Sequence, residues 1–230
     1  MIKACLFDLD GTLLNTLTSI RYFVNKNVSD YGIKAISEEE TKVFVGKGAK
    51  VLIENVFRDR GLDLEEDETR ALCDRITKTY VKEYDSDPAY LTEPYENIVD
   101  TVNKLKSMGI KLAVISNKPD PTVKSLVHKF FGESFLIVEG ASDRMPLKPR
   151  AEWPLDICKR LGVLPEEVMY VGDTSTDMET ARNFGAGVSV GVLWGFREEA
   201  ELVSSGADVI VSKAEELCGV VIKENQKESQ

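Results

Sequence analysis

The stretch IKACLFDLDGT, residues 2–12, indicates the class of fold. It begins as an almost continuous apolar run and carries Asp8 and Asp10 toward its carboxyl end. A short run of this kind is typical of a strand that is buried on both faces of a parallel sheet. Ligands of open α/β sheets bind beyond the carboxyl ends of the strands, so the two acids lie where a site is expected.

Similar apolar runs return in the second part of the chain, separated by helical patterns that often end at a glycine. The predicted strands are residues 110–116, 135–139, 168–173, 187–193 and 207–211. The predicted helices are residues 96–108, 121–131, 151–161, 176–184, 198–205 and 213–221. Strands that alternate with helices predict an α/β fold with a doubly wound parallel sheet and a Rossmann-like core.

Residues 16–90 interrupt this alternation, because they hold no clear strand. Their helical patterns lie near residues 17–31, 49–60 and 68–84. We therefore expect an all-helical cap, residues 16–90, inserted into an α/β core of residues 1–15 and 91–222. The last residues, 223–230, are polar and are expected to form a frayed tail.

Composition narrows the classes of partner. The chain has 230 residues and a formal net charge of −10, which argues against a nucleic-acid partner and against docking on an anionic membrane. No apolar stretch reaches the roughly 20 residues of a membrane helix, and acids interrupt the N-terminal run too early for a signal peptide. Four scattered cysteines without a CxxC pair predict buried, reduced thiols and a cytoplasmic location. We expect a small-molecule partner and a monomer or homodimer.

The other predicted strand ends also carry polar side chains. Ser116 and Asn117 end the strand 110–116, Asp173 ends the strand 168–173, and Lys148 precedes a helix. Each feature alone has a structural explanation, because acids often cap helices and Ser-Asn is common in turns. Together they suit phosphoryl transfer.

In that chemistry each charged group has a task. Asp8 and Asp173 could share a hard cation such as Mg²⁺, which prefers oxygen ligands. A carboxylate can attack phosphorus to form an aspartyl-phosphate. Asp10 could exchange a proton with the leaving oxygen, and Lys148 could balance the negative charge of the transition state.

Four motifs carry a resemblance to a known family: DLDGT (8–12), SNK (116–118), KP (148–149) and GDTSTD (172–177). Over nearly the whole chain this set resembles the haloacid dehalogenase superfamily of phosphatases. The segments LWGF (193–196), AELVSSGADVIV (200–211) and VGKGAKVLIENV (45–56) are similar to its phosphoglycolate phosphatase branch.

The resemblance implies a role for each motif residue. The implied catalytic residues are the nucleophile Asp8, the general acid and base Asp10, and Lys148, which holds the nucleophile and the phosphate. The implied metal ligands are Asp8, Asp10 through its backbone carbonyl, and Asp173, with Asp177 supporting the metal shell. The implied substrate-binding residues are Ser116 and Asn117, with Thr12 shaping the loop.

The expected function is Mg²⁺-dependent hydrolysis of a small phosphomonoester, with phosphoglycolate as the best single candidate. In the cap, Lys47 and Lys50 beside Gly46 and Gly48 are candidates for binding the substrate carboxylate. A sugar-phosphate mutase, a nucleotidase or a pyrophosphatase of the same fold remains open at this point, as does a regulatory protein that binds a phosphorylated metabolite without turnover.

Overall fold

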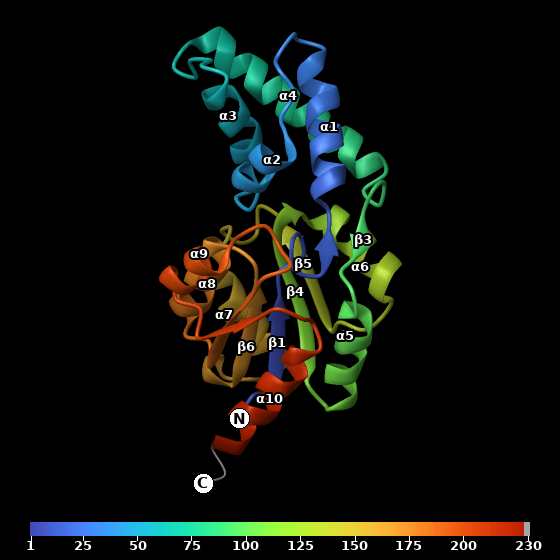
Figure 1. The fold of residues 1–230 in the computed structure, drawn as a ribbon, viewed down its shortest axis with the longest axis vertical. Helices are drawn as coiled ribbons and strands as arrows, with labels where there is room; N and C mark the ends of the chain where they lie inside the picture. The colour runs from blue at the N-terminus through green and yellow to red at the C-terminus, as the bar shows by residue number, and fades with distance from the viewer. Residues whose placement is uncertain (228–230) are drawn as a thin grey trace. The chain divides into compact units, whose positions relative to one another are not determined.

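The computed structural model describes residues 1–227, and contacts within the chain divide it into two units. The first unit joins Met1–Asn15 to the chain from Glu93 onward, and the second unit is Thr16–Thr92. The chain thus returns to the first unit at Glu93, whereas the sequence analysis placed this return at residue 91. Figure 1 shows the second unit in blue to green. Among residues 1–227, no helix combines the length and apolarity that crossing a membrane requires.

The first unit is built on one six-stranded sheet in the order β5-β4-β1-β6-β7-β8. Its strands are β1 (Ala4–Phe7), β4 (Lys111–Pro119), β5 (Ile137–Ala141), β6 (Val168–Gly172), β7 (Val188–Val192) and β8 (Val209–Val211). Every pair of neighbours is parallel, and β1 lies between β4 and β6. The predicted α/β fold with a doubly wound parallel sheet is confirmed.

Helices cover both faces of this sheet (Figure 1). They are α5 (Ile98–Ser107), α6 (Asp120–Phe131), α7 (Glu152–Leu161), α8 (Ser175–Phe184), α9 (Glu199–Ser204) and α10 (Glu216–Lys227), with a 3-10 turn at Pro165–Glu167. Successive side chains of β1 point to opposite faces. Leu6 joins the apolar cluster of α7 and α8, whereas Phe7 meets Phe135, which also contacts Phe131 of α6. Strand β1 is therefore buried on both faces, and the acids Asp8 and Asp10 lie just beyond its carboxyl end.

A short antiparallel pair closes the first unit where the chain leaves it and returns. Its strands are β2 (Leu14–Asn15) and β3 (Glu93–Pro94). The pairing fixes the two crossing points side by side, which is how a long insertion can be accommodated directly after β1.

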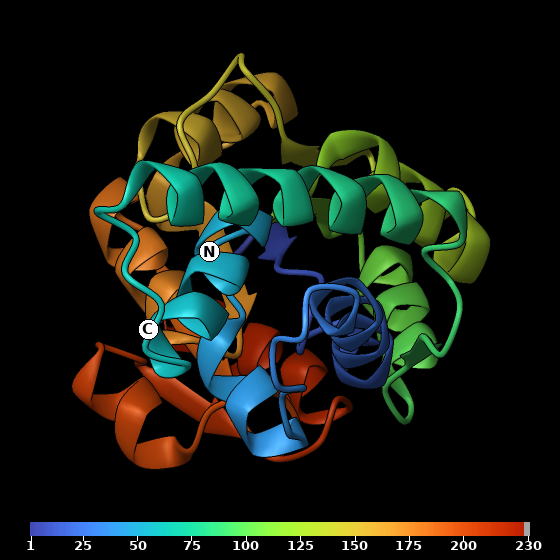
Figure 2. The ribbon, with the colours of Figure 1, turned by 90° about the horizontal axis from the view of Figure 1, so that it is seen from above.

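The second unit contains helices alone among its described elements, as the sequence predicts. They are α1 (Leu17–Ser29), α2 (Glu38–Phe44), α3 (Ala49–Asp59) and α4 (Asp67–Ser86). Helix α4 packs against α1 and α3, and α2 packs against the same two helices. Figure 2 shows α4 from above as one long, continuous helix.

Arg60 connects three parts of the second unit. Its guanidinium donates to Glu40 Oε1 at 2.9 Å and to the backbone oxygens of Lys34 and Ala35 at 3.1 and 2.8 Å. The hydrogen bonds from Arg60 lower the pKa of Glu40 to about 2. Glu40 also closes a capping box with Ser37 at the start of α2. This ion pair therefore holds α2 and the preceding loop against the end of α3.

The predicted frayed tail is wrong for residues 223–227, because α10 continues to Lys227. One reason is that a solvent-facing helix end tolerates polar residues. Another is that Asn225 Oδ1 accepts a hydrogen bond from the backbone N–H of Ile2, and Asn225 Nδ2 donates to the Ile2 oxygen at 3.3 Å. Residues 228–230 lie outside the described residues.

Candidate active site

Three carboxylates meet at the carboxyl end of the sheet. Asp8 follows β1, Asp173 follows β6, and Asp177 lies in the first turn of α8. Each offers a carboxylate oxygen within 4.8 Å of the others, and all three residues are buried. Neighbouring parallel strands end at the same edge, which explains why acids separated by more than 160 residues form one cluster, here called the acid cluster.

Lys148 is the cation inside the acid cluster. Its Nζ donates to Asp8 Oδ1 at 2.7 Å and to Asp177 Oδ1 at 2.8 Å, and its side chain is only 2% exposed. The side chain of Asn117 holds the Lys148 backbone from both sides: Oδ1 accepts from Lys148 N at 2.9 Å and Nδ2 donates to Lys148 O at 3.3 Å. The Asn117 amide therefore positions the lysine loop.

Asp177 is held by donors on both of its oxygens. Its Oδ2 accepts from Thr174 N at 3.1 Å and from Thr174 Oγ1 at 2.6 Å, and its Oδ1 also accepts from Tyr170 OH at 3.2 Å. The bond from Thr174 N–H to Asp177 Oδ2 belongs to a capping box at the start of α8. Asp177 is thereby suited to orient Lys148 and the cluster around it.

Asp173 is fixed by the loop after β1 and by the segment LWGF. Thr12 Oγ1 donates to its Oδ1 at 3.0 Å, and the backbone N–H of Phe196 donates to its Oδ2 at 2.8 Å. Trp194 Nε1 donates to the Thr12 oxygen at 3.0 Å, which ties the same two segments together. Thr12 thus shapes the loop, and LWGF forms one wall of the site.

Glycines allow these segments to approach one another. A Cβ on Gly11, where φ is +87°, would lie 2.2 Å from Asp173 Oδ2. A Cβ on Gly195 would lie 2.3 Å from Asp173 Cβ and 2.5 Å from the Gly11 oxygen. Real Cβ atoms do not come so close to other atoms, so the position of Asp173 depends on glycine at both places.

The acid cluster has more negative than positive charge. Burial raises the pKa of Asp8 to about 7, although Lys148 opposes the rise. Burial raises the pKa of Asp173 well above its usual range, and the neighbouring Asp177 and Asp8 add to this. Burial alone would lower the pKa of Lys148, but Asp177 and Asp8 raise it well above the usual value. Such a set of oxygens fits a hard divalent cation, which would offset the repulsion between carboxylates.

Asp10 is not one of the three acids of the cluster and has a lysine of its own. Its carboxylate oxygens accept hydrogen bonds from Lys118 Nζ at 3.1 and 3.2 Å. Lys118 is buried, and its backbone N–H donates to Ser116 Oγ at 3.3 Å. The sequence analysis assigned no role to Lys118, although it is the third residue of SNK. Its position just beyond a strand end was the available signal.

Lys47 and Lys50 belong to the second unit, and both are exposed. Lys50 forms ion pairs with Asp74 at 3.7 Å and Glu54 at 4.0 Å inside that unit. Their part in binding substrate stays a prediction.

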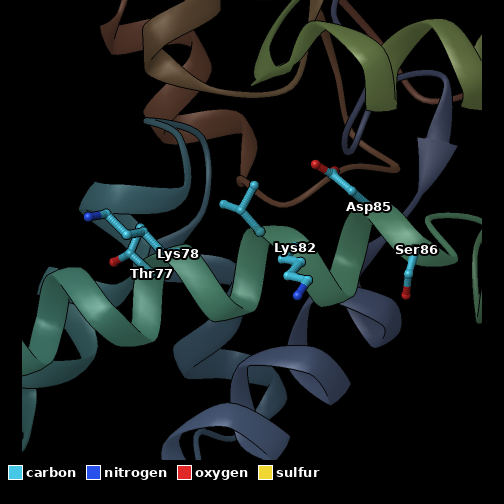
Figure 3. A pocket seen from close by; sticks show the side chains of 6 residues that line it. Thr77, Lys78, Lys82, Asp85 and Ser86 are labelled. Atoms are coloured by element: carbon cyan, nitrogen blue, oxygen red, sulfur yellow. The ribbon is translucent and has the colours of Figure 1, made fainter.

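An open hollow of about 660 Å³ lies along α4 in the second unit. Its lining consists of Thr77, Lys78, Val81, Lys82, Asp85 and Ser86. Figure 3 shows that Lys78, Lys82 and Asp85 point in different directions rather than toward one point. Nothing in this lining resembles the convergent charges of the acid cluster, which remains the candidate active site.

Comparison with known proteins identifies the family of the chain. A family model described as haloacid dehalogenase-like hydrolase matches residues 5–191. The phosphoglycolate phosphatase of Aquifex aeolicus is 28% identical over 94% of this chain and 95% of its own.

Two solved structures are similar over the length of the chain. The crystal structure of a protein proposed to be a phosphoglycolate phosphatase in Lactobacillus delbrueckii has a TM-score of 0.88 and 30% identity, covering 95% of this chain and 98% of the other. A predicted phosphoglycolate phosphatase from Haemophilus somnus has a TM-score of 0.83 and 26% identity, covering 95% and 97%.

Proposed function

The chain belongs to the haloacid dehalogenase-like hydrolases, and from this premise we propose that it is a Mg²⁺-dependent phosphatase of small phosphomonoesters that prefers phosphoglycolate. The observation that carries the proposal is the buried contact of Lys148 with Asp8 and Asp177. It holds a carboxylate beside a fixed positive charge at the place where an α/β sheet binds its ligand.

The proposed reaction has two displacements at phosphorus. In the first, an Asp8 oxygen forms a bond to phosphorus while the bond from phosphorus to the ester oxygen breaks, and Asp10 gives a proton to the departing alcohol. In the second, water attacks the phosphorus of the aspartyl-phosphate and gives a proton to Asp10. The bond from phosphorus to Asp8 breaks, and orthophosphate leaves with Asp8 restored.

The surrounding charges serve this reaction. Lys148 lies against Asp8 and can balance negative charge on the phosphoryl oxygens in the transition state. Mg²⁺, held by Asp8, Asp173 and the backbone carbonyl of Asp10, would supply further charge neutralisation and fix the phosphate. Ser116 lies buried in β4, just before the bulge at Asn117 and Lys118, where its hydroxyl could contact the phosphoryl group.

The choice of substrate is proposed on two grounds. The relative from Aquifex aeolicus is similar to this chain over nearly the whole length of both, and it is named a phosphoglycolate phosphatase. The core motifs serve any phosphomonoester, so we expect the helical second unit to limit the size of the leaving group, as an inserted domain that closes over a site would.

A panel of phosphomonoesters tests the proposal. We expect phosphate release from phosphoglycolate with Mg²⁺, none after chelation, and inhibition by Ca²⁺, whose larger and more variable coordination misplaces the phosphate. Asp8→Asn keeps the size of the side chain but removes the nucleophilic charge, so turnover should fall by orders of magnitude while the fold survives.

Three results would overturn parts of this proposal. Full turnover after exhaustive chelation would show that the reaction needs no metal. A preference for hexose phosphates, or their isomerisation, would show that the substrate is a sugar phosphate. Unchanged turnover in Asp8→Asn would show that Asp8 is not the nucleophile.

A further inference from the structure

We propose that Lys118 is the specificity-determining residue of this site and binds a carboxylate on the leaving group of the substrate. The inference rests on the proposed phosphatase function and assigns the substrate class: short phosphomonoesters with a carboxylate close to the ester oxygen. When such a substrate binds, Lys118 is shared between Asp10 and that carboxylate.

The first argument is the local fold, which aims Lys118 away from the regular sheet. Strands β4 and β5 pair at Ser116 with Gly140 and pair again at Pro119 with Ala141. Three residues of β4 therefore match one of β5, and Asn117 and Lys118 form a bulge. Bulges commonly re-aim side chains next to active sites.

Two contacts hold the bulge in place. A Cβ on Gly140 would lie 2.5 Å from the Lys118 oxygen, so only glycine allows β5 to approach there. The backbone N–H of Gly140 donates to Asp120 Oδ1 at 3.0 Å, which fixes the chain just beyond Lys118. The lysine is thus presented by a braced segment rather than by a free loop.

The second argument is burial and charge. The side chain of Lys118 is 7% exposed, and burying an ammonium is unfavourable unless an anion accompanies it. Asp10 supplies that anion through both oxygens and keeps 20% of its own side chain exposed. The Lys118–Asp10 pair therefore lies at a solvent-accessible side of the site, whereas Lys148 is enclosed with Asp8 and Asp177.

The third argument concerns the chemistry of the leaving group. In the proposed reaction Asp10 exchanges a proton with the ester oxygen, so any group bound close to that oxygen lies close to Asp10. A carboxylate there would be repelled by Asp10 unless a cation balanced the two charges. Lys118 already contacts Asp10, and its ammonium is a compact charge on a flexible stem that can change partners or bridge two of them.

Lys118 also differs from the lysines of the second unit. Lys50 is 67% exposed and has acidic partners within its own unit. An exposed ion pair discriminates weakly, because water screens it. A buried lysine loses more when its anion is absent, and this makes it the stronger candidate for selecting a substrate.

The test compares two substrates that differ in the carboxylate. Phosphoglycolate carries it, and ethyl phosphate has the same two-carbon length without it. We expect Lys118→Met to raise the KM for phosphoglycolate by about 10- to 100-fold relative to the KM for ethyl phosphate. Lys118→Arg should keep part of the preference for phosphoglycolate over ethyl phosphate, because it keeps the charge.

Lys129→Met is the matched control, because it removes an exposed cation from α6 without touching the site. It should leave the KM for both substrates unchanged. Thermal midpoints of all variants show whether Lys118→Met folds. If it does not, Lys118→Gln removes the same charge but keeps polar atoms beside Asp10.

The possible outcomes separate the two proposals. If the wild type prefers phosphoglycolate but Lys118→Met loses the same factor on both substrates, Lys118 only positions Asp10 and the inference is overturned. If Lys118→Met does not fold, Lys118→Gln takes its place, and equal losses of this variant on both substrates also overturn the inference. If the wild type releases phosphate equally from both substrates, neither Lys118 nor any other residue selects the carboxylate. If the wild type releases phosphate from no ester, the phosphatase function itself fails.

Discussion

Replacing Gly195 by alanine should displace Asp173 and impair catalysis without unfolding the chain. The added Cβ would lie 2.3 Å from Asp173 Cβ, 2.5 Å from Asp173 Oδ2 and 2.5 Å from the Gly11 oxygen. Ordinary contacts begin near 3.4 Å, so Gly195 itself, or both Asp173 and the Gly11 oxygen, must move by about 1 Å. A displacement of about 1 Å in an active site can cost about 100-fold in rate.

The same variant should lose about 1–3 kcal/mol of stability, as small-to-large changes in packed regions do. For a chain of this size that corresponds to a fall of about 2–12 °C in Tm. The half-saturating Mg²⁺ concentration should also rise, because Asp173 is a proposed metal ligand. The assay is kcat/KM on p-nitrophenyl phosphate across a Mg²⁺ titration, with Tm measured in parallel.

Gly219→Ala is the matched control. Gly219 lies inside α10, and a Cβ there would meet nothing within 4 Å. Alanine should therefore stabilise the helix by about 0.5–1 kcal/mol and leave activity unchanged. If Gly195→Ala kept the activity and the Mg²⁺ dependence of Gly219→Ala, the segment LWGF would not shape the site.

Three further predictions follow from the charges. Lys148→Met should abolish most turnover and cost about 3–5 kcal/mol at pH 8, because it leaves buried carboxylates unpaired; wild-type stability in urea unfolding would contradict this. The pKa of Asp8 is about 7 when folded and near 4 when unfolded, so the metal-free folded state binds the proton more tightly and loses stability as pH rises from about 4 to 7. Mg²⁺ should thus raise the free energy of unfolding more at pH 8 than at pH 5. An equal increase at both pH values would refute Asp8 as a metal ligand. Glu40→Gln should lower stability by about 1–2 kcal/mol through its lost ion pair with Arg60. Glu39→Gln, which leaves that pair intact, should lower stability less, and equal Tm values of the two variants would show that the pair contributes nothing.

The acid cluster was predictable from sequence because strand ends of a parallel sheet meet at one edge. Asp8 and Asp173 each follow an apolar run, and once the sheet is inferred their proximity follows from topology. The helical second unit was predictable for a similar reason, since residues 16–90 lack the apolar runs of buried strands.

The Lys118–Asp10 contact was not predictable in the same way. A regular strand alternates its side chains, whereas the bulge at Asn117 and Lys118 depends on a long-range pairing with β5. The end of α10 was missed because composition predicts a frayed tail where a single side chain, Asn225, joins the helix to Ile2. Both features depend on partners far away in the chain.

Oxygen exchange tests the central claim most directly, that Asp8 attacks phosphorus and water then attacks the aspartyl-phosphate. The enzyme is turned over many times on phosphoglycolate in water enriched in ¹⁸O, and the masses of the released phosphate and of the peptide containing Asp8 are measured. The mechanism predicts one ¹⁸O atom in each phosphate and none in Asp8. Enrichment of the Asp8 carboxylate would mean that water attacks its carbonyl carbon, and the proposed second step would be wrong.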